Sequence, residues 1–250
     1  MRRETKDRIT VSRSRNLALA AVFGALYAAL VIGFAPISNL PIQVRIADVL
    51  MPLAILFGWP VILGLGIGTV VGNFAADSIT GFPSASIGLD MVGGSLVNLL
   101  AGFLAWKIGQ RSWRIGNWNR FIATLLLAAL ISVVVGSYLS FVVSLPVDLS
   151  ILGILAGEIV AINIGRIRNW NNSWFIATLV ETALISVVVG GYLSVVFPQL
   201  LVLSILGILV GEVLAINIGG FALLNIIGKP RRLDLFRSWG LQIYGTDHEK

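Results

Sequence analysis

The chain of 250 residues contains no cysteine, and its single histidine is His248, close to the C-terminal end. Without cysteine no disulfide can form, and the usual Cys/His ligand sets for a metal ion are unavailable. A Ser–His or Cys–His nucleophile pair inside the apolar part of the chain is excluded for the same reason. We therefore expect no metal site, no cofactor and no catalytic residues, and we interpret the protein as a non-enzyme.

Charged residues are also scarce, at 12% of the sequence against 57% hydrophobic residues. Soluble domains carry about twice that fraction of charge. Apolar runs of roughly 20 residues, the length needed to cross a bilayer, follow one another between positions 16 and 228. The runs lack the alternation of β-barrel strands, and helices satisfy their own backbone hydrogen bonds in lipid. The sequence predicts an all-α, polytopic transmembrane helical bundle.

The second half of the chain contains an internal repeat. Segments 121–165 and 175–219 align without a gap, and 31 of the 45 aligned pairs are identical. Each copy holds two apolar runs around a short turn and therefore predicts a helical hairpin. About eight spans follow, or six if one copy does not insert. The expected parts are a basic cytoplasmic N-terminus (1–15), transmembrane helices at 16–35, 47–57, 61–76 and 89–108 within 16–112 with a loop over 77–88, the first hairpin (113–165), the second hairpin (166–228) and a cytoplasmic tail (229–250).

The distribution of positive charge predicts the orientation of these spans. Under the eight-span arrangement every lysine and arginine except Arg45 falls on one side of the membrane. Lys and Arg collect on the cytoplasmic side of a membrane. We therefore expect a protein of the cell membrane with both of its termini in the cytoplasm. The net charge of +6 is then a signal of topology, and we expect contacts with membrane lipid and none with nucleic acid.

Ionisable groups inside a membrane cost about 2.5–3.5 kcal/mol each on insertion scales, so each one requires an explanation. We expect a solute-binding role for the polar side chains in or next to the apolar runs. Other readings stay open: Arg45 and Asp48 are three residues apart and suit a structural ion pair, Asp90 suits a helix N-cap, and a buried glutamate suits a protonated structural group. The candidate solute-binding residues are Gln43, Arg45, Asp48, Asn73, Asp90, Asn98, Glu181 and Glu212.

Small residues form stripes at helical spacing on two of the expected spans. Gly64, Gly68 and Gly72 predict close packing against a neighbouring helix. The first span presents two such faces, and we expect one of them to bind a partner protein, with internal packing as the alternative. The candidate partner-binding residues are Ala21, Ala25 and Ala29.

Several motifs resemble the QueT family of queuosine-precursor transporters, in the same order along the chain. The most specific is Pro-Ile-Gln-Val-Arg-Ile-Ala-Asp (41–48), which stands behind Ala-Leu-Tyr-Ala-Ala-Leu (25–30) and Ala-Pro-Ile-Ser (35–38). Weaker pieces are Gly-Leu-Asp (88–90), Gly-Gly-Ser-Leu (93–96), Gly-Glu (211–212) and Gly-Gly-Phe-Ala-Leu-Leu (219–224). The resemblance covers roughly 16–112 and 173–230.

The resemblance implies a six-helix S component of an energy-coupling-factor (ECF) importer, which binds a scarce solute, here a 7-deazaguanine base. Such a protein works with a membrane scaffold subunit, contacted by the small-residue face of the first helix, and with two ATPase subunits. The chain has no Walker A pattern, which agrees with ATP hydrolysis by another subunit. The alternatives are a stand-alone secondary carrier, an intramembrane enzyme and a structural membrane protein.

The chain departs from the family pattern in having two final hairpins where the family has one. We expect the family's last two helices to correspond to the second copy, because it keeps the longer final helix. The repeat leaves open whether Glu158 or its counterpart Glu212 provides the carboxyl group of the site.

Overall fold

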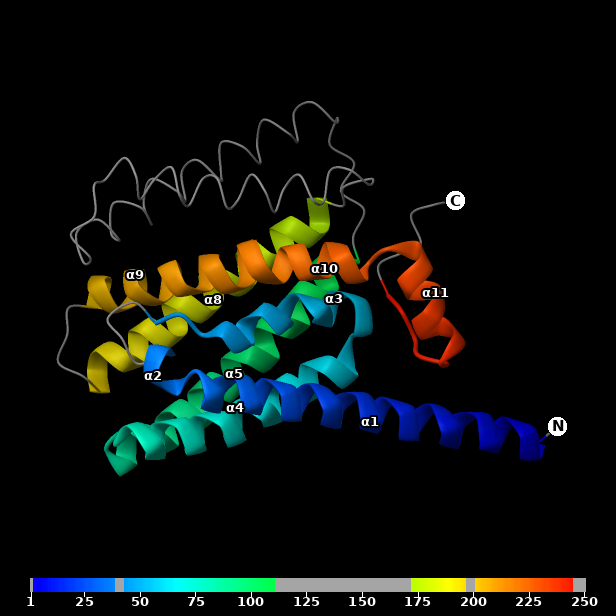
Figure 1. Ribbon diagram of the computed structural model, residues 1–250, viewed down its shortest axis with the longest axis horizontal. Coiled ribbons are helices and arrows are strands. Elements are labelled where there is room, and N and C mark those ends of the chain that lie inside the picture. The colour runs from blue at the N-terminus through cyan, green and yellow to red at the C-terminus, as the bar shows by residue number, and fades with distance from the viewer. Residues whose placement is uncertain (1, 39–42, 111–171, 197–200, 245–250) are drawn as a thin grey trace.

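The computed structural model describes residues 2–38, 43–110, 172–196 and 201–244, and within these ranges every regular element is a helix (Figure 1). Five of the described helices are long and apolar enough to span a membrane, in agreement with the predicted polytopic bundle. Exposed apolar side chains such as Ile67, Phe74 and Leu96 cover the outside of the bundle, as lipid contact requires. The first hairpin (113–165), with Glu158, lies outside the described residues. The five candidate spans are Arg13–Gly33, Trp59–Thr80, Ser86–Gly109, Ser173–Ser194 and Val202–Ile227.

The first helix, α1 (Arg2–Gly33), packs along α4 (Trp59–Thr80) through the predicted glycine stripe. A Cβ atom added at Gly64 would lie 2.4 Å from the Ala20 carbonyl oxygen, and one at Gly68 would lie 2.6 Å from the Gly24 carbonyl oxygen. Only glycine permits backbones to approach this closely. The predicted close packing of this stripe is confirmed, and the short helix α2 (Ala35–Ser38) follows at the end of α1.

The predicted loop over 77–88 is wrong, because α4 continues to Thr80 and only three residues separate it from α5 (Ser84–Gly109). Gly81 has a φ of 77° and ends α4 by donating its backbone N–H to the Asp77 carbonyl. Glycine adopts this left-handed conformation without steric cost. Pro83 then stands directly before α5. Asp90 therefore lies inside α5 and is not the N-cap of a helix.

The predicted second span (47–57) is present as two short helices, the 3₁₀-helix η1 (Ile46–Leu53) and α3 (Ala54–Phe57). Pro52 lies inside η1 and lacks an N–H group, which favours an irregular helix here. Gly58, with a φ of 63°, ends α3 and leads into α4. The segment is too short to span a bilayer by itself, and most of its side chains are buried among the longer helices.

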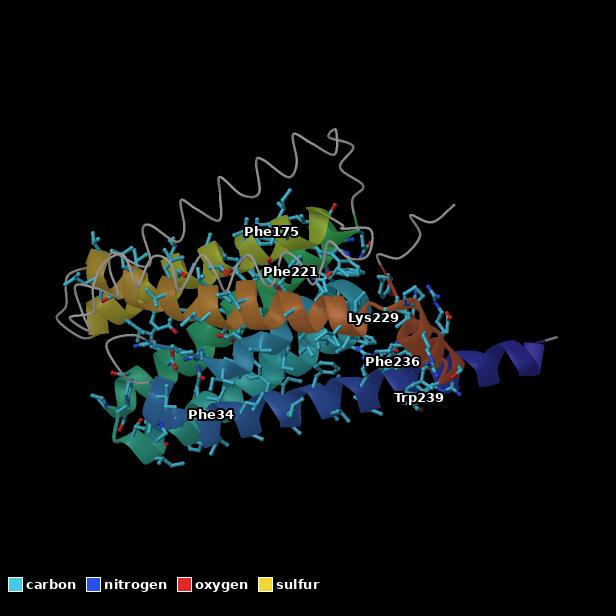
Figure 2. All side chains as sticks on the ribbon, turned by 45° about the horizontal axis from the view of Figure 1, so that its top comes forward. Phe34, Phe175, Phe221, Lys229, Phe236 and Trp239 are labelled. Carbon is cyan, nitrogen blue, oxygen red and sulfur yellow. The ribbon has the colours of Figure 1, made fainter. Side chains whose placement is uncertain are left out.

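The second hairpin consists of α8 (Asn172–Val196), followed by α9 (Leu201–Glu212), the π-helix η2 (Val213–Gly220) and α10 (Phe221–Ile227). α8 packs against α5, and η2 packs against η1. Figure 2 shows Phe175 on α8 and Phe221 on α10 near each other, and their ring centroids are 5.3 Å apart. The second copy of the repeat is therefore part of the helical core.

The C-terminal helix α11 (Pro230–Ser238) lies across one end of the bundle, next to α1 (Figure 1). The ring of Phe236 packs edge-on against Phe57 of α3, and Figure 2 places Phe236 and Trp239 at the opposite end of the molecule from Phe34. Farther along, the backbone N–H of Tyr244 donates to the Leu56 carbonyl at 2.8 Å. The tail is thereby fixed to the end of the bundle that carries the basic termini.

Candidate functional site

A first group of polar side chains surrounds Arg45, just before η1. The Arg45 guanidinium lies 3.6 Å from the Asp90 carboxylate on α5, and the Tyr192 hydroxyl on α8 donates a hydrogen bond to Asp90. Asn73 on α4 donates its side-chain N–H to the Asp90 backbone carbonyl at 3.0 Å. We call these four residues the arginine cluster. It joins three spans and the chain before η1 through the side chain and the backbone carbonyl of Asp90.

Two features of the local structure build the arginine cluster. Gly94 lies one turn after Asp90 on α5, and a Cβ atom there would lie 2.9 Å from the Asn73 side-chain nitrogen, so glycine leaves room for the amide. Burial by itself lowers the pKa of the Arg45 guanidinium, but the charge of Asp90, with further contributions from Tyr27 and Asp48, raises it well above the ordinary value. Arg45 therefore stays positively charged and pairs with Asp90, so the predicted ion pair between Arg45 and Asp48 is not formed.

A second group of polar side chains lies around Asp48 of η1. The Tyr27 hydroxyl on α1 donates to the Asp48 carboxylate at 2.5 Å. The Asn98 side-chain N–H groups on α5 donate to the Tyr27 hydroxyl and to the Thr69 hydroxyl, each at 2.8 Å. All four side chains are buried. Asn98 follows Asp90 by eight residues on α5, which places this group about 12 Å along the helix from the arginine cluster.

Glu212, on α9 of the second hairpin, lies next to the group of side chains around Asp48. The Asp48 and Glu212 carboxyl groups are near enough to share a hydrogen bond. Their approach depends on Gly211, because a Cβ atom there would lie 1.7 Å from the Gln43 backbone carbonyl oxygen. The glycine allows the chain before η1 to lie directly on α9. The predicted residue Gln43 is half-buried at this contact and touches α9 through its backbone.

Glu181 on α8 completes the second group, and its side chain is fully buried. It lies near enough to Asp48 and Glu212 to interact electrostatically with both carboxyl groups. Neither carboxyl oxygen of Glu181 has a hydrogen-bond partner among the described residues, and one oxygen each of Asp48 and Glu212 is also unpartnered. We call Asp48, Glu181, Glu212, Tyr27 and Asn98 the carboxyl cluster. Four buried acceptor atoms without donors are unusual in a folded protein and are suited to a ligand that supplies N–H groups.

The helix geometry changes where the carboxyl cluster meets the second hairpin. Directly after Glu212 the chain continues as the π-helix η2, and π-helical stretches often occur at functional sites. Asn217 in η2 accepts a hydrogen bond from Thr182, the residue next to Glu181, and its side-chain nitrogen has no partner in the described part of the chain. η2 and the 3₁₀-helix η1 pack against each other. Two irregular helices therefore border the most polar part of the bundle.

The structure thus brings seven of the predicted solute-binding residues into two adjacent clusters, with Gln43 at their edge. Sequence reasoning missed Tyr27, Tyr192, Thr69 and Asn217. For Tyr27 a signal was present, because it is the only side chain between positions 17 and 35 able to form a hydrogen bond. The predicted partner-binding residues Ala21, Ala25 and Ala29 lie on a face of α1 that the described part of the chain leaves exposed.

The fold defines a multi-pass helical membrane protein with two clusters of polar side chains buried inside its bundle. The family model described as QueT transporter matches residues 17–168, more than half of the sequence. The chain therefore belongs to the QueT transporter family, which is a family of transport proteins and not of enzymes. No curated protein and no solved structure matches the chain.

The family match also bears on the repeat. It runs continuously through the first copy (121–165), whereas the structure describes the second copy packed against the core. The sequence resemblance assigns the family's last two helices to the second copy. That assignment stays a prediction, because the family match includes the first copy and the described residues include only the second.

Proposed function

We propose that the protein is the substrate-binding S component of an ECF importer that takes up a 7-deazaguanine precursor of queuosine or archaeosine. The solute is captured from outside, and separate ATPase subunits supply the energy for its release inside. Both termini lie in the cytoplasm, where the basic residues gather. Membership in the QueT transporter family supports the transport role.

The observation that carries the proposal is the carboxyl cluster in the middle of the bundle. Buried polar groups in a membrane protein are costly and therefore mark solute or ion pathways. The edge of a guanine-like base presents adjacent N–H donors, which match carboxyl oxygens, and a carbonyl acceptor, which matches Asn98 or Arg45. Glu212, Asp48 and Glu181 provide acceptors that have no partner among the described residues and that such an edge requires.

The exposed face of α1 supports the association with a scaffold subunit. Gly24 and Ala28 are buried against α4, while Ala21, Ala25 and Ala29 point away from it and leave a shallow surface. Small residues allow another helix to approach closely in a membrane. We assign this face to the scaffold subunit.

Binding of 7-deazaguanines to the purified protein tests the substrate class. We expect micromolar or tighter binding by the wild-type chain, measured by calorimetry in detergent or nanodiscs, and a loss of about tenfold or more in Glu212→Gln, which removes a charged acceptor. Glu158→Gln is the matched control, because Glu158 is the equivalent position in the first copy. Absence of binding by the wild-type chain would overturn the substrate class, and loss only in Glu158→Gln would assign the site to the first copy.

Uptake into vesicles tests the coupling to partner subunits. The wild-type chain is expected to transport the solute only when the scaffold and ATPase subunits are present together with ATP. Ala25→Leu is expected to reduce this uptake strongly while leaving solute binding unchanged, because the larger side chain separates the helices. Uptake by the chain alone would instead identify a stand-alone secondary carrier.

A further inference from the structure

The turn after α11 directs the chain back toward the bundle. The backbone N–H of Gly240 donates to the Arg237 carbonyl at 2.8 Å, and that of Leu241 donates to the Phe236 carbonyl at 3.1 Å. With Gly240 at a φ of 73°, these two bonds form the Schellman motif that ends many helices at a glycine. Figure 1 shows the chain after this turn, in red, returning to the end of the bundle. We call residues 230–244 the C-terminal strap.

One part of the C-terminal strap contacts α1. Gly240 lies directly on Arg15 of α1, because a Cβ atom added at Gly240 would lie 1.6 Å from a guanidinium nitrogen of Arg15. Any larger residue at this position would have to displace the Arg15 side chain. The ring centroids of Phe236 and Phe57 are 5.3 Å apart, and those of Phe57 and Phe23 on α1 are 6.0 Å apart. The strap therefore reaches α1 directly at Arg15 and indirectly through Phe57.

The other part of the strap covers the end of α3. The Tyr244 N–H donates to the Leu56 carbonyl at 2.8 Å, and thereby satisfies one of the carbonyl groups left free at a helix C-terminus. The Tyr244 ring packs edge-on against Trp106 of α5, with 5.3 Å between the ring centroids. Gly58 provides the space, because a Cβ atom there would lie 2.9 Å from a Tyr244 ring carbon. Since α3 directly continues η1, the strap joins α1 to the segment that carries Asp48.

The contacts of α1 show why such a connection matters. α1 is the least buried of the five candidate spans. Its close contacts with the glycine stripe of α4 lie between Ala20 and Val31, so the turn that contains Arg15 precedes them. Parts of a structure with few buried contacts open most easily. Without the strap, this end of α1 is expected to swing about its contact with α4.

We propose that the C-terminal strap fixes the position of α1 relative to η1 and α3, and so holds the face of Ala21, Ala25 and Ala29 in the orientation that a partner subunit binds. The inference rests on the proposed function only for the role of this face. Association costs less when the docking surface is already ordered, so loss of the strap weakens binding of the partner. Most side chains of η1 are buried among the spans, so solute binding changes little.

Distances between spin labels on the full-length chain in nanodiscs test the position of α1. The chain contains no native cysteine, so labels attach only at Arg13→Cys on α1 and Leu100→Cys on α5, two exposed positions. We expect a single narrow distance distribution in this background. Adding Phe236→Ala and Tyr244→Ala removes both rings that anchor the strap and should broaden the distribution.

The matched control instead adds Leu235→Ala and Gln242→Ala, two exposed positions of the strap, and should leave the distribution unchanged. Gly240→Val is a second strap variant, because a β-branched residue is strongly disfavoured at positive φ and would displace Arg15. It keeps both rings and gives an answer if the double variant folds poorly. Strap variants with a distribution as narrow as that of the control overturn the proposal.

Solute binding and uptake by the same variants without labels test the consequence for the partner. We expect the strap variants to bind 7-deazaguanine as tightly as the wild-type chain, while ATP-driven uptake with the scaffold and ATPase subunits falls about tenfold through the lost ring contacts. Full uptake despite a broadened distribution overturns the role of the strap in partner binding. A wild-type chain that neither binds nor transports the solute overturns the proposed function, and the label distances then decide the role of the strap by themselves.

Discussion

Two groups of buried polar side chains lie about 12 Å apart along α5, and they differ in how their charges are balanced. In the arginine cluster, the Asp90 carboxylate receives Arg45 and the Tyr192 hydroxyl, and its backbone carbonyl receives Asn73. In the carboxyl cluster, Glu181 has no partner within the described ranges. The charges of the arginine cluster are paired with each other, whereas the carboxyl cluster contains hydrogen-bond acceptors that no described residue satisfies.

The difference suggests separate roles. A buried ion pair contributes little net stability compared with apolar side chains packed in its place. It nevertheless holds the elements that it joins in one arrangement. Removal of one partner is strongly unfavourable, because the other charge is then buried alone. The arginine cluster therefore fixes the chain before η1 to α4, α5 and α8. Unpartnered acceptors do the reverse, because they remain unfavourable until a ligand satisfies them. Removal of a carboxyl group without a partner from the carboxyl cluster should accordingly raise stability, whereas removal of one partner of the ion pair from the arginine cluster should lower it.

The largest expected effect is the loss of stability in Arg45→Ala. The substitution leaves the Asp90 carboxylate buried without its cation, and we expect a loss of about 3 kcal/mol. Thermal unfolding in detergent measures it. Adding Asp90→Asn to the same chain removes the remaining charge and should restore much of the lost stability. A single variant as stable as the wild-type protein would show that the ion pair does not fix the fold.

The next effect tests the approach of the second hairpin to the chain before η1. Gly211→Ala places a methyl group 1.7 Å from the Gln43 carbonyl oxygen, so α9 must move away. We expect a loss of about 2 kcal/mol and weaker solute binding, because Glu212 moves with α9. Gly191→Ala is the matched control, since no atom of the described residues lies within 4 Å of an added Cβ atom there. The control should be neutral or slightly more stable.

The sequence predicted the class of the fold and most residues of the two clusters, because charges and amides stand out against apolar spans. The glycine stripe on α4 was recognisable for the same reason, as small residues recur at helical spacing. Long-range pairing was not predictable in this way. Arg45 pairs with Asp90, which is 45 positions away in the chain, and not with the nearby Asp48, because the chain before η1 is extended and directs Arg45 toward α5.

The irregular helices were only partly predictable from the sequence. Pro52 favours an irregular helix around Asp48. The π-helix after Glu212 has an apolar sequence that a regular helix also accommodates, so no local pattern indicates its geometry. Tyr27 was overlooked because an aromatic residue in an Ala-rich span is expected to pack as an apolar group, although its hydroxyl connects Asp48 to Asn98.

Tyr27→Phe tests this connection with a smaller expected effect. The substitution removes one hydroxyl and leaves the ring in place, so that Asp48 loses a donor and Asn98 loses an acceptor. We expect a loss of stability of about 1.5 kcal/mol, measured by thermal unfolding, together with weaker solute binding. An unchanged affinity would separate Tyr27 from the binding site and limit it to a structural role.

The smallest expected change in stability is that of Glu181→Leu. It distinguishes the two clusters most directly, because this substitution is expected to stabilise the protein, whereas Arg45→Ala destabilises it. Glu181→Leu introduces the residue that occupies the equivalent position in the first copy, Leu127. It removes a buried carboxyl group that has no partner within the ranges the structure describes, and we expect a gain of about 1 kcal/mol in the free energy of unfolding. Uptake of the solute should nevertheless fall, since stability and activity are often opposed at binding sites. Thermal unfolding and vesicle uptake measured on the same preparation test both parts. A loss of stability comparable to that of Arg45→Ala would mean that Glu181 supports the fold, and that the two clusters do not differ in the way their charges suggest.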